Sequence, residues 1–369
     1  MNQHSLTTRL QEYIKVVLPE AHGHQQKAIR DFIAALLLKR SCCQATLARC
    51  FDNFEAASRC LSRLLHNPRL EPEALSVAHA QALVSQLPIG CGVRVAIDWT
   101  SEDQQHLLVA SLLVGRRAVP IYWQAYATRN LKGAQKSLER RFTRHLCETV
   151  LRNLERRRLI VTADRGFCDV DFLDLLDELG VSFVIRTMAN VKLYWEQAWR
   201  KLGSLRLRRN QRRRVLGKLW FNQSNPRRYW LAQSRARNRA GRWEYWHLVS
   251  NRPLSALQMA QEYAHRFGCE EGFRDAKRLL GFATARIQEM KAWARMFALV
   301  AAALLILTRL GLRLLEHPEC QAWLRKVRSR RNPRSELSLV CAALELLDQV
   351  IELWEWLDHD FKLKLEAKL

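Results

Sequence analysis

Three acidic residues stand at positions where carboxylates could hold divalent cations. Asp98 and Asp164 each close an apolar run that is typical of a buried strand, and Glu270 lies in a segment with helical spacing of apolar residues. A carboxylate at a strand end costs desolvation free energy unless a metal ion or hydrogen bonds compensate. Oxygen ligands suit Mg²⁺, and two such ions about 3.5–4 Å apart promote in-line phosphoryl transfer. Taken singly, either aspartate can instead cap a helix or a turn, so these two positions alone leave both interpretations open.

The segment around Glu270 is more specific. On a helix with about 100° per residue, one acid, one tyrosine and three bases fall within a stripe about 80° wide: Tyr263, Arg266, Glu270, Arg274 and Lys277. The neighbouring acids Glu271 and Asp275 fall outside it. Pairing between residues four apart explains an acid beside one arginine, but not a tyrosine and three bases around a single acid. A metal-binding acid flanked by phosphate-binding donors explains the whole stripe.

The elements that must position these residues form an α/β pattern. Alternating apolar residues predict strands at 93–98, 107–114 and 118–126, then at 158–163, 181–186 and 246–250. Helical spacing predicts helices at 132–154, 170–179 and 254–280, the last with Pro253 near its start and Gly281 just past its end. Three hairpin-like strands followed by alternating helices and strands indicate a mixed sheet with helices on its faces.

The charge of the chain points to a polyanionic partner. Its 369 residues include 60 Lys and Arg against 36 Asp and Glu, a formal net charge of +24. Residues 200–242 hold 15 Lys and Arg among 43 residues and neither Asp nor Glu, within a segment, 191–243, that interrupts the α/β pattern. Charges at this density repel one another unless an anion lies nearby. Nucleic acid is the simplest partner, although a ribosomal or membrane-surface protein could share the overall charge.

The two ends of the chain are predicted to be helical. Residues 1–88 carry helical spacing through 28–38 and 45–65, which suits either a small DNA-binding domain or a helical packing module. Residues 313–369 contain a basic, proline-punctuated patch at 325–334 and then an amphipathic helix from Glu336, a candidate for dimerisation.

We expect a cytoplasmic protein without membrane contact. The apolar run 296–307 has 12 residues, fewer than the roughly 20 that span a bilayer, so it predicts a buried core helix. The first residues lack the apolar stretch of a signal peptide. The ten cysteines show no spacing typical of zinc ligands, and we expect them to be reduced.

The spacing on the Glu270 helix also has a counterpart among known proteins. Tyr263-x2-Arg266-x3-Glu270-x6-Lys277 resembles the Y-R-E-K signature of bacterial insertion-sequence transposases of the DDE class, the group called family four. Ala96-Ile-Asp98-Trp-Thr resembles the first-aspartate motif of that family, and Thr162-Ala-Asp164-Arg-Gly-Phe167 resembles its second. The resemblance covers roughly residues 93–310, with the motifs in the family's order.

This resemblance implies an α/β, RNase H-like mixed sheet with flanking helices and a β-rich insertion. The catalytic core would then comprise 89–190 and 244–312, the basic insertion 191–243, a DNA-end-binding domain 1–88 and a C-terminal helical region 313–369. Asp98, Asp164 and Glu270 would be the catalytic residues and the ligands of Mg²⁺, which Mn²⁺ can replace. Gly268 and Gly272 depart from the family's pattern, and each costs a helix about 1 kcal/mol.

The resemblance also implies a set of DNA contacts. Residues that match Tyr263, Arg266 and Lys277 grip phosphates at the transposon end, and Arg274 stands where a basic residue is usual. Arg186 takes the place of an arginine on the strand after the second aspartate. Trp246 matches a tryptophan that stacks on a flipped base, with Trp243 as the second choice; such stacking is worth roughly 1–3 kcal/mol.

The implied activity is cut-and-paste transposition. The enzyme would nick double-stranded DNA at the terminal inverted repeats, form and reopen a hairpin, and join the 3′ ends to target DNA, as a homodimer near the bacterial nucleoid. Two alternatives stay open at this point. One is an RNase H-like nuclease that cuts without integration, and the other is a basic DNA-binding protein whose acids are structural.

Overall fold

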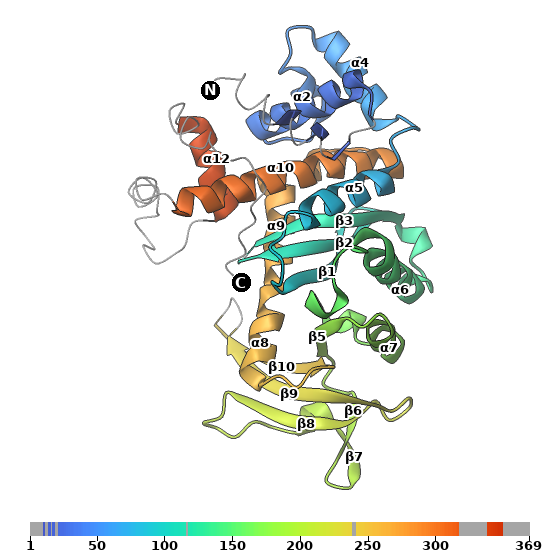
Figure 1. The fold of residues 1–369 in the computed structure, drawn as a ribbon, viewed down its shortest axis with the longest axis vertical. Helices are drawn as coiled ribbons and strands as arrows, with labels where there is room; N and C mark the ends of the chain where they lie inside the picture. Colours follow the sequence, from blue (N-terminus) through green and yellow to red (C-terminus); the bar gives the residue numbers. More distant parts are fainter. Residues whose placement is uncertain are drawn as a thin grey trace.

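A computed structural model describes residues 10, 11, 14, 15, 17, 18, 21–115, 117–237, 241–316 and 338–349. Its centre is a ten-stranded mixed sheet with the order β3-β2-β1-β4-β5-β10-β9-β8-β6-β7. Helices cover both faces of the first half of this sheet, the N-terminal helices lie at one end of the molecule, and the second half extends away at the other end (Figure 1). The predicted α/β class is confirmed.

The first half of the sheet follows the predicted strands closely. Strands β1, β2 and β3 form an antiparallel meander, and β4 and β5 add parallel to β1 on its other side. Their bounds are Val93–Glu102, Gln105–Val114, Arg117–Ala127, Leu159–Ala163 and Ser182–Thr187. Each strand carries buried Val, Ile, Leu or Ala side chains, which is why alternating apolar residues reveal it.

Alternation along β3 places helices on opposite faces of this half. Tyr122 stacks on Phe142 of α6 with ring centroids 4.7 Å apart, whereas the next residue, Trp123, contacts Phe297 of α10 at 5.4 Å. One face carries α6 (Gln135–His145), with the π-turn η2 (Leu146–Val150), and α7 (Val170–Glu178). Helices α8 (Ala256–His265), α9 (Phe267–Arg274) and α10 (Met290–Glu316) lie on the other face.

The helix predicted at 254–280 is divided into segments. It begins as α8 with a capping box at Ser255, breaks at Arg266, continues as α9 and ends in a π-turn, η6 (Asp275–Leu279). Gly281 follows with φ of +67°, a left-handed conformation that favours glycine and stops the helix as predicted.

The basic insertion extends the central sheet. Its strands are β6 (Lys192–Trp195), β7 (Ala198–Lys201), β8 (Arg213–Phe221) and β9 (Arg227–Arg237). Strand β10 (Trp243–Ser250) joins them to the core because it pairs antiparallel with both β9 and β5. The predicted start of this strand at 246 is wrong by three residues, since its first residues are exposed and lack a buried apolar pattern.

The N-terminal helices share one apolar core with the sheet. They are α2 (Gly23–Lys39), α3 (Gln44–Ala48), α4 (Phe54–Leu65) and α5 (Pro72–Val84). The helix predicted through 45–65 is two helices, because Asn53 caps α4 by accepting a hydrogen bond from the Ala56 amide at 2.9 Å. Helix α5 packs along β3, where the buried His79 Nε2 lies 3.0 Å from the Pro120 carbonyl oxygen.

Helix α10 is longer than the apolar run that predicted it. Its residues Met290–Leu314 are long and apolar enough to cross a bilayer, so the argument from the short run does not hold. Burial is the better criterion: 78% of the most apolar window is buried inside the protein, as in the core helix of a globular domain. The described part of the C-terminal region is α12 (Leu339–Gln349), which packs against α10. The basic patch at 325–334 and the part of the predicted dimerisation helix beyond residue 349 lie outside the described residues.

Candidate active site

The two candidate aspartates lie at the same edge of the sheet. Strands β1 and β4 pair in parallel from Val93 and Leu159 to Ile97 and Ala163. Asp98 and Asp164 each follow the last pair of this ladder, so the two residues are adjacent. The prediction that Asp98 ends its strand is wrong, because β1 continues to Glu102 through its pairing with β2. The sequence predicted this proximity from two separate apolar runs that both end in aspartate.

Helix α8 is fixed over this edge by an ion pair from β1. The Arg94 guanidinium donates two hydrogen bonds to the Glu262 carboxylate, at 2.6 and 2.7 Å. The next residue, Tyr263, is fully buried, and its hydroxyl donates to Asp164 Oδ1 at 3.1 Å. Burial raises the pKa of Tyr263 to about 12, so this hydroxyl keeps its proton at neutral pH.

Arg266 joins the other two acids. Its Nη1 donates to Asp98 Oδ2 and its Nη2 to Glu270 Oε1, both at 2.8 Å. The arginine side chain is 6% exposed, against 18% for Asp98 and 42% for Glu270. The break between α8 and α9 falls at this residue, and its guanidinium also lies 5.0 Å from the centre of the Phe267 ring. One buried cation therefore links the first and third carboxylates.

The three carboxylates also interact electrostatically. Burial raises the pKa of Asp98 to about 6, and the negative charges of Asp164 and Glu270 add to that rise. The positive charge of Arg266 acts in the opposite direction. A second cation close to these carboxylates would lower the pKa of Asp98 further, which is the electrostatic setting of a cation-binding site.

The remaining bases of the predicted stripe lie further away. Lys277 sits in the π-turn, and its Nζ donates to the Ser101 carbonyl at 2.6 Å and pairs with Glu102 Oε1 at 2.8 Å, at the end of β1. Arg274 turns to Glu271, which accepts its hydrogen bond at 2.5 Å. The structure therefore does not bring Arg274 to the carboxylates, because an acid three residues back on the same helix engages it.

The two tryptophans named from the sequence differ in exposure. Trp246 is 8% exposed and packs between Tyr263 and Phe267, with ring centroids at 5.1 and 5.7 Å. Trp243 is 44% exposed, and the guanidiniums of Arg235 and Arg237 lie 4.4 and 5.0 Å from its ring centre. As the side chains stand, only the second of these rings has a face open to a ligand.

Arg186 completes the surroundings of Tyr263. Its Nη2 donates to Glu244 Oε1 at 2.5 Å, and its positive charge acts on the Tyr263 hydroxyl. Arg165, directly after Asp164, joins it in lining a cavity of about 690 Å³. That cavity continues over Tyr245 and His247 toward Arg206 of the insertion. Basic side chains therefore lead from the carboxylates onto the insertion.

Part of the chain, including two of the candidate acids, is similar to a known family. Residues 129–306 match the family model described as "Transposase DDE domain". This stretch is similar to transposase DDE domains. The mixed sheet with flanking helices is the RNase H-like arrangement expected of such a domain. A comparison with curated proteins gives no match.

The matched stretch contains two of the three candidate acids. Asp164 and Glu270 lie inside it, with Tyr263, Arg266 and Lys277, whereas Asp98 precedes it. Asp98 lies next to the matched stretch in the structure, because β1 pairs with β4 and Arg266, between α8 and α9, contacts its carboxylate.

The three candidate acids fit a divalent cation in the kind of ligand atom that they supply. Asp98, Asp164 and Glu270 supply the oxygen ligands that Mg²⁺ prefers, and two of them already share one cation, the Arg266 guanidinium. Among the described residues, no group of three acidic, histidine or cysteine side chains stands ready to ligate one ion. Arg266 occupies Asp98 Oδ2 and Glu270 Oε1, so a cation that bound through those two oxygens would have to displace it.

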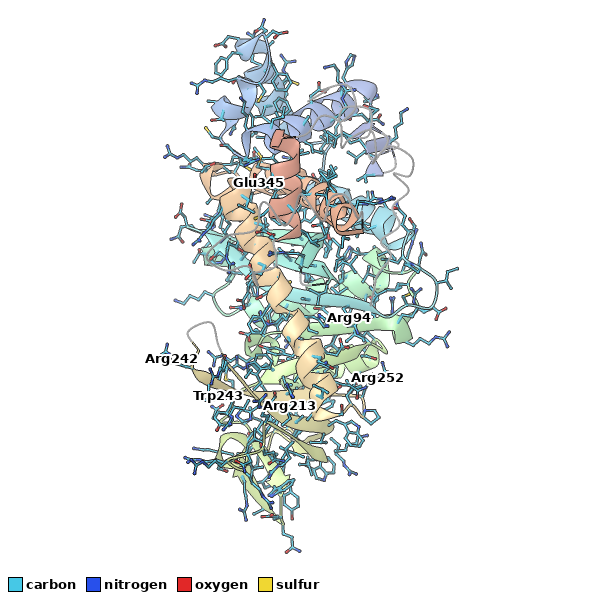
Figure 2. The ribbon with its side chains drawn as sticks, turned by 90° about the vertical axis from the view of Figure 1, so that its left-hand side faces the viewer. Arg94, Arg213, Arg242, Trp243, Arg252 and Glu345 are labelled. Carbon is cyan, nitrogen blue, oxygen red and sulfur yellow. The ribbon has the colours of Figure 1, made fainter. Side chains whose placement is uncertain are left out.

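The insertion is strongly basic, with 15 Lys and Arg and no acid in residues 200–242. Figure 2 shows Arg213, Arg242 and Trp243 on the insertion, among many nitrogen-tipped side chains, and Arg94 on the core. Arginines also lie over exposed or half-buried aromatic rings: Arg228 lies 5.7 Å from the Trp220 ring centre and Arg214 lies 5.3 Å from that of Trp195. Interleaved arginine and aromatic side chains suit phosphates and bases.

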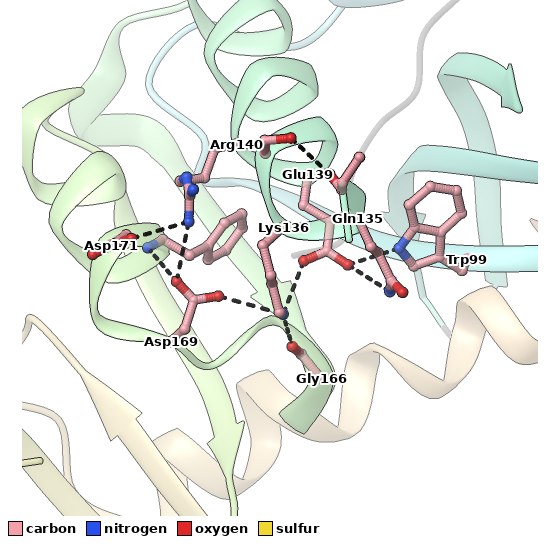
Figure 3. A network of polar contacts seen from close by, with 11 residues as sticks. Trp99, Gln135, Lys136, Glu139, Arg140, Gly166, Asp169 and Asp171 are labelled. Carbon is pink, nitrogen blue, oxygen red and sulfur yellow. Dashed lines mark hydrogen bonds and ion pairs between the residues drawn. The ribbon is translucent and has the colours of Figure 1, made fainter. Parts of the chain in front are cut away.

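Sequence reasoning did not find one group of polar residues behind the aspartates. Glu139 and Lys136 of α6 contact the chain segments that follow Asp98 and Asp164 (Figure 3). A lysine three residues before a glutamate on a predicted helix is too common a pattern to mark them. The only sequence signal is that Glu139 lies among the apolar positions of an otherwise strongly basic helix.

Proposed function

We propose that the protein is a DNA transposase that acts by cut-and-paste transposition, with hairpin formation, and that it belongs to the Y-R-E-K group of family four. The observation that carries the proposal is the convergence of Asp98, Asp164 and Glu270 around Arg266 and Tyr263, inside and beside the stretch that is similar to transposase DDE domains. Ordinary surface pairing does not explain why two adjacent strands and a helix bring three acids to one buried arginine and tyrosine, with Arg266 bonded to Asp98 and Glu270 and Tyr263 bonded to Asp164.

Asp98, Asp164 and Glu270 would hold Mg²⁺, or Mn²⁺ in its place, and the ions would activate the attacking oxygen and neutralise charge on the scissile phosphate. The residues of the chain prepare this site. The Tyr263 hydroxyl holds Asp164 by one oxygen and leaves the second oxygen of that carboxylate for another partner. Arg266, once it releases a carboxylate, has a guanidinium fork that fits a phosphate.

The outer basic residues would hold the DNA strand. Lys277 and Arg186 pair with Glu102 and Glu244, so each already has a carboxylate partner that a DNA phosphate can replace. The basic surface of the insertion lies beyond them on the same sheet. Arg274 is held by Glu271 and would need to turn to join this set.

We assign base stacking to Trp243, the second of the two tryptophans named from the sequence. Its ring is exposed and flanked by two arginines, whereas stacking on Trp246 would require its cluster with Tyr263 and Phe267 to open. Base stacking on an exposed ring contributes roughly 1–3 kcal/mol per base.

The partners proposed are double-stranded DNA and a second copy of the chain. The terminal inverted repeats and the target DNA would be bound in turn, and a homodimer would supply one active site for each end. We also propose that residues 1–88 recognise the ends and that the protein works in the bacterial cytoplasm. The net charge of +24 supports the DNA partner.

One experiment separates this function from its alternatives. The purified protein is given Mg²⁺ and DNA that carries the inverted repeats flanking its own gene, either uncut or pre-cut, together with a supercoiled target plasmid. We expect cleavage at the repeat ends, a hairpin intermediate on the uncut substrate, and joining of pre-cut ends to the plasmid. Cleavage without joining would identify a nuclease, and Mg²⁺-independent binding without cleavage would identify a DNA-binding protein.

A further inference from the structure

Helix α6 carries a buried glutamate that reaches the strand bearing Asp98. Glu139 is 1% exposed and accepts hydrogen bonds from Trp99 Nε1 at 2.9 Å, Gln135 Nε2 at 2.9 Å and Lys136 Nζ at 3.0 Å (Figure 3). Trp99 directly follows Asp98, and successive residues of a strand point to opposite faces. Asp98 therefore faces α9 and the other acids, while Trp99 is held by α6 from behind.

The same network reaches the turn that follows Asp164. Lys136 Nζ donates to the Gly166 carbonyl oxygen, pairs with Asp169 Oδ2 at 3.3 Å and lies 5.8 Å from the centre of the Phe167 ring. Gly166 is two residues beyond Asp164, in the turn η4 (Arg165–Phe167). Two adjoining side chains of one helix thus hold both segments that follow the candidate aspartates (Figure 3).

This connection lies where the sheet stops fixing the distance between the aspartates. The ladder between β1 and β4 ends at the pair Ile97 and Ala163, one residue before each aspartate. Beyond that pair, β1 continues against β2, whereas the segment that follows β4 turns away into η4. The link Trp99–Glu139–Lys136–Gly166 spans the opening just past the end of the ladder.

A purely structural role would not require charged groups here. Glu139 is buried but the Lys136 side chain is 44% exposed, and an ion pair with an exposed partner contributes little to stability, so this pair is weak support for a purely stabilising role. Groups that support and orient metal ligands affect metal binding more than stability, because their loss typically reduces metal affinity by about 10–100-fold.

We propose that Glu139 and Lys136 are positioning residues that set the separation of Asp98 and Asp164 for divalent-cation binding. The inference rests on the proposed function, since it takes both aspartates as ligands. The two residues act through Trp99 and Gly166 and touch neither DNA nor cation themselves.

The test measures cation affinity apart from activity. Binding of Mn²⁺ to the full chain is followed by the electron paramagnetic resonance signal of the free ion, and Mg²⁺-dependent cleavage of inverted-repeat DNA is titrated in parallel. Lys136→Met should raise the Mn²⁺ dissociation constant and the half-saturating Mg²⁺ concentration by about tenfold or more, with unchanged affinity for DNA ends in EDTA. Lys136→Arg, which can reach the same acceptors, should recover most of the loss.

Two further variants complete the design. Glu139→Gln keeps an acceptor for Trp99 but loses its charge, and should also weaken Mn²⁺ binding. This variant provides the test if Lys136→Met proves too unstable to purify. Arg144→Met is the matched control, because Arg144 lies on the same helix but pairs at the surface with Glu178 and Glu148. It should leave both cation titrations unchanged.

The outcomes separate this inference from the proposed function. The positioning role alone is overturned if the wild-type chain binds the cations and the Lys136→Met and Glu139→Gln variants bind them as tightly as Arg144→Met does. A wild-type chain that neither binds Mn²⁺ nor cleaves with Mg²⁺ overturns both. Weaker cation binding confined to the two network positions, with rescue by arginine, supports the positioning role.

Discussion

Replacing Arg266 with methionine should lower the free energy of unfolding by about 3 kcal/mol in the absence of divalent cations. Removing one partner of a buried ion pair costs roughly 3–5 kcal/mol, because the other charge is left unpaired in a medium of low polarity. Arg266 and Asp98 are both largely buried, whereas Glu270 is about half exposed and water can replace its contact. The expected loss therefore lies at the lower end of that range.

The assay is equilibrium urea unfolding in EDTA at neutral pH. Four proteins form a double-mutant cycle: wild type, Arg266→Met, Asp98→Asn and the double variant. Because a neutral asparagine needs no counter-charge, we expect the two substitutions to be coupled by about 2 kcal/mol. Arg274→Met is the control on the same helix, and its more exposed pair with Glu271 should contribute at most about 1 kcal/mol.

The reasoning would be refuted by additive effects in this cycle, or by a loss in Arg266→Met no larger than that in Arg274→Met. Added Mg²⁺ should stabilise Arg266→Met more than wild type, because the cation no longer competes with the guanidinium for the carboxylates.

Three further predictions follow from single positions. Burial raises the pKa of Asp275 from 3.8 to about 6, so the folded state binds the proton of this carboxyl more tightly than the unfolded state does. The stability that this protonated carboxyl confers is present below about pH 4 and is lost as the pH rises through 6. Asp275→Asn should remove about 3 kcal/mol of that pH dependence in urea unfolding, and an unchanged pH profile would contradict the assignment. Gly272→Ala should destabilise the protein by about 1–2 kcal/mol despite a better helix propensity, because its Cβ would lie 2.9 Å from the Ala118 carbonyl oxygen; equal or greater stability would show that α9 can shift away from β3. Trp243→Ala should weaken binding of end DNA with an unpaired base by about 1–3 kcal/mol without loss of fold stability, whereas Trp246→Ala should lower stability; the reverse pattern in fluorescence anisotropy and thermal unfolding would return the stacking role to Trp246.

The sequence predicted those parts of the fold whose side chains repeat a simple period. The core strands alternate between two covered faces, so most of their bounds are nearly right, and the position of Asp164 just after β4 follows from them. The predicted end of β1 at Asp98 is four residues too early, because the strand continues through polar residues to Glu102. The insertion was harder, because exposed arginines interrupt the alternation that β8, β9 and the start of β10 would otherwise show. Its continuity with the central sheet depends on pairing between β10 and β5, which no local pattern indicates.

The sequence predicted which residues form the candidate site better than it predicted how their side chains are arranged. A straight helix placed five residues on one stripe, but the break at Arg266 and the π-turn around Lys277 separate them into different surroundings. The helical wheel gives angles and not the direction of long side chains, so it did not show that Arg266 would lie buried between two acids and that Arg274 would turn to Glu271. The support from Glu139 depends on packing between α6 and the sheet, which arises only in the folded chain.

The central claim is that Asp98, Asp164 and Glu270 together cut DNA with the help of divalent cations. The most direct measurement is the Mg²⁺-dependent cleavage rate of inverted-repeat DNA by wild type, Asp98→Asn and the control Asp171→Asn, an exposed acid on α7. We predict that Asp98→Asn abolishes cleavage while it binds end DNA with near wild-type affinity, and that Asp171→Asn cuts normally. Cleavage by Asp98→Asn at the wild-type rate would contradict the account.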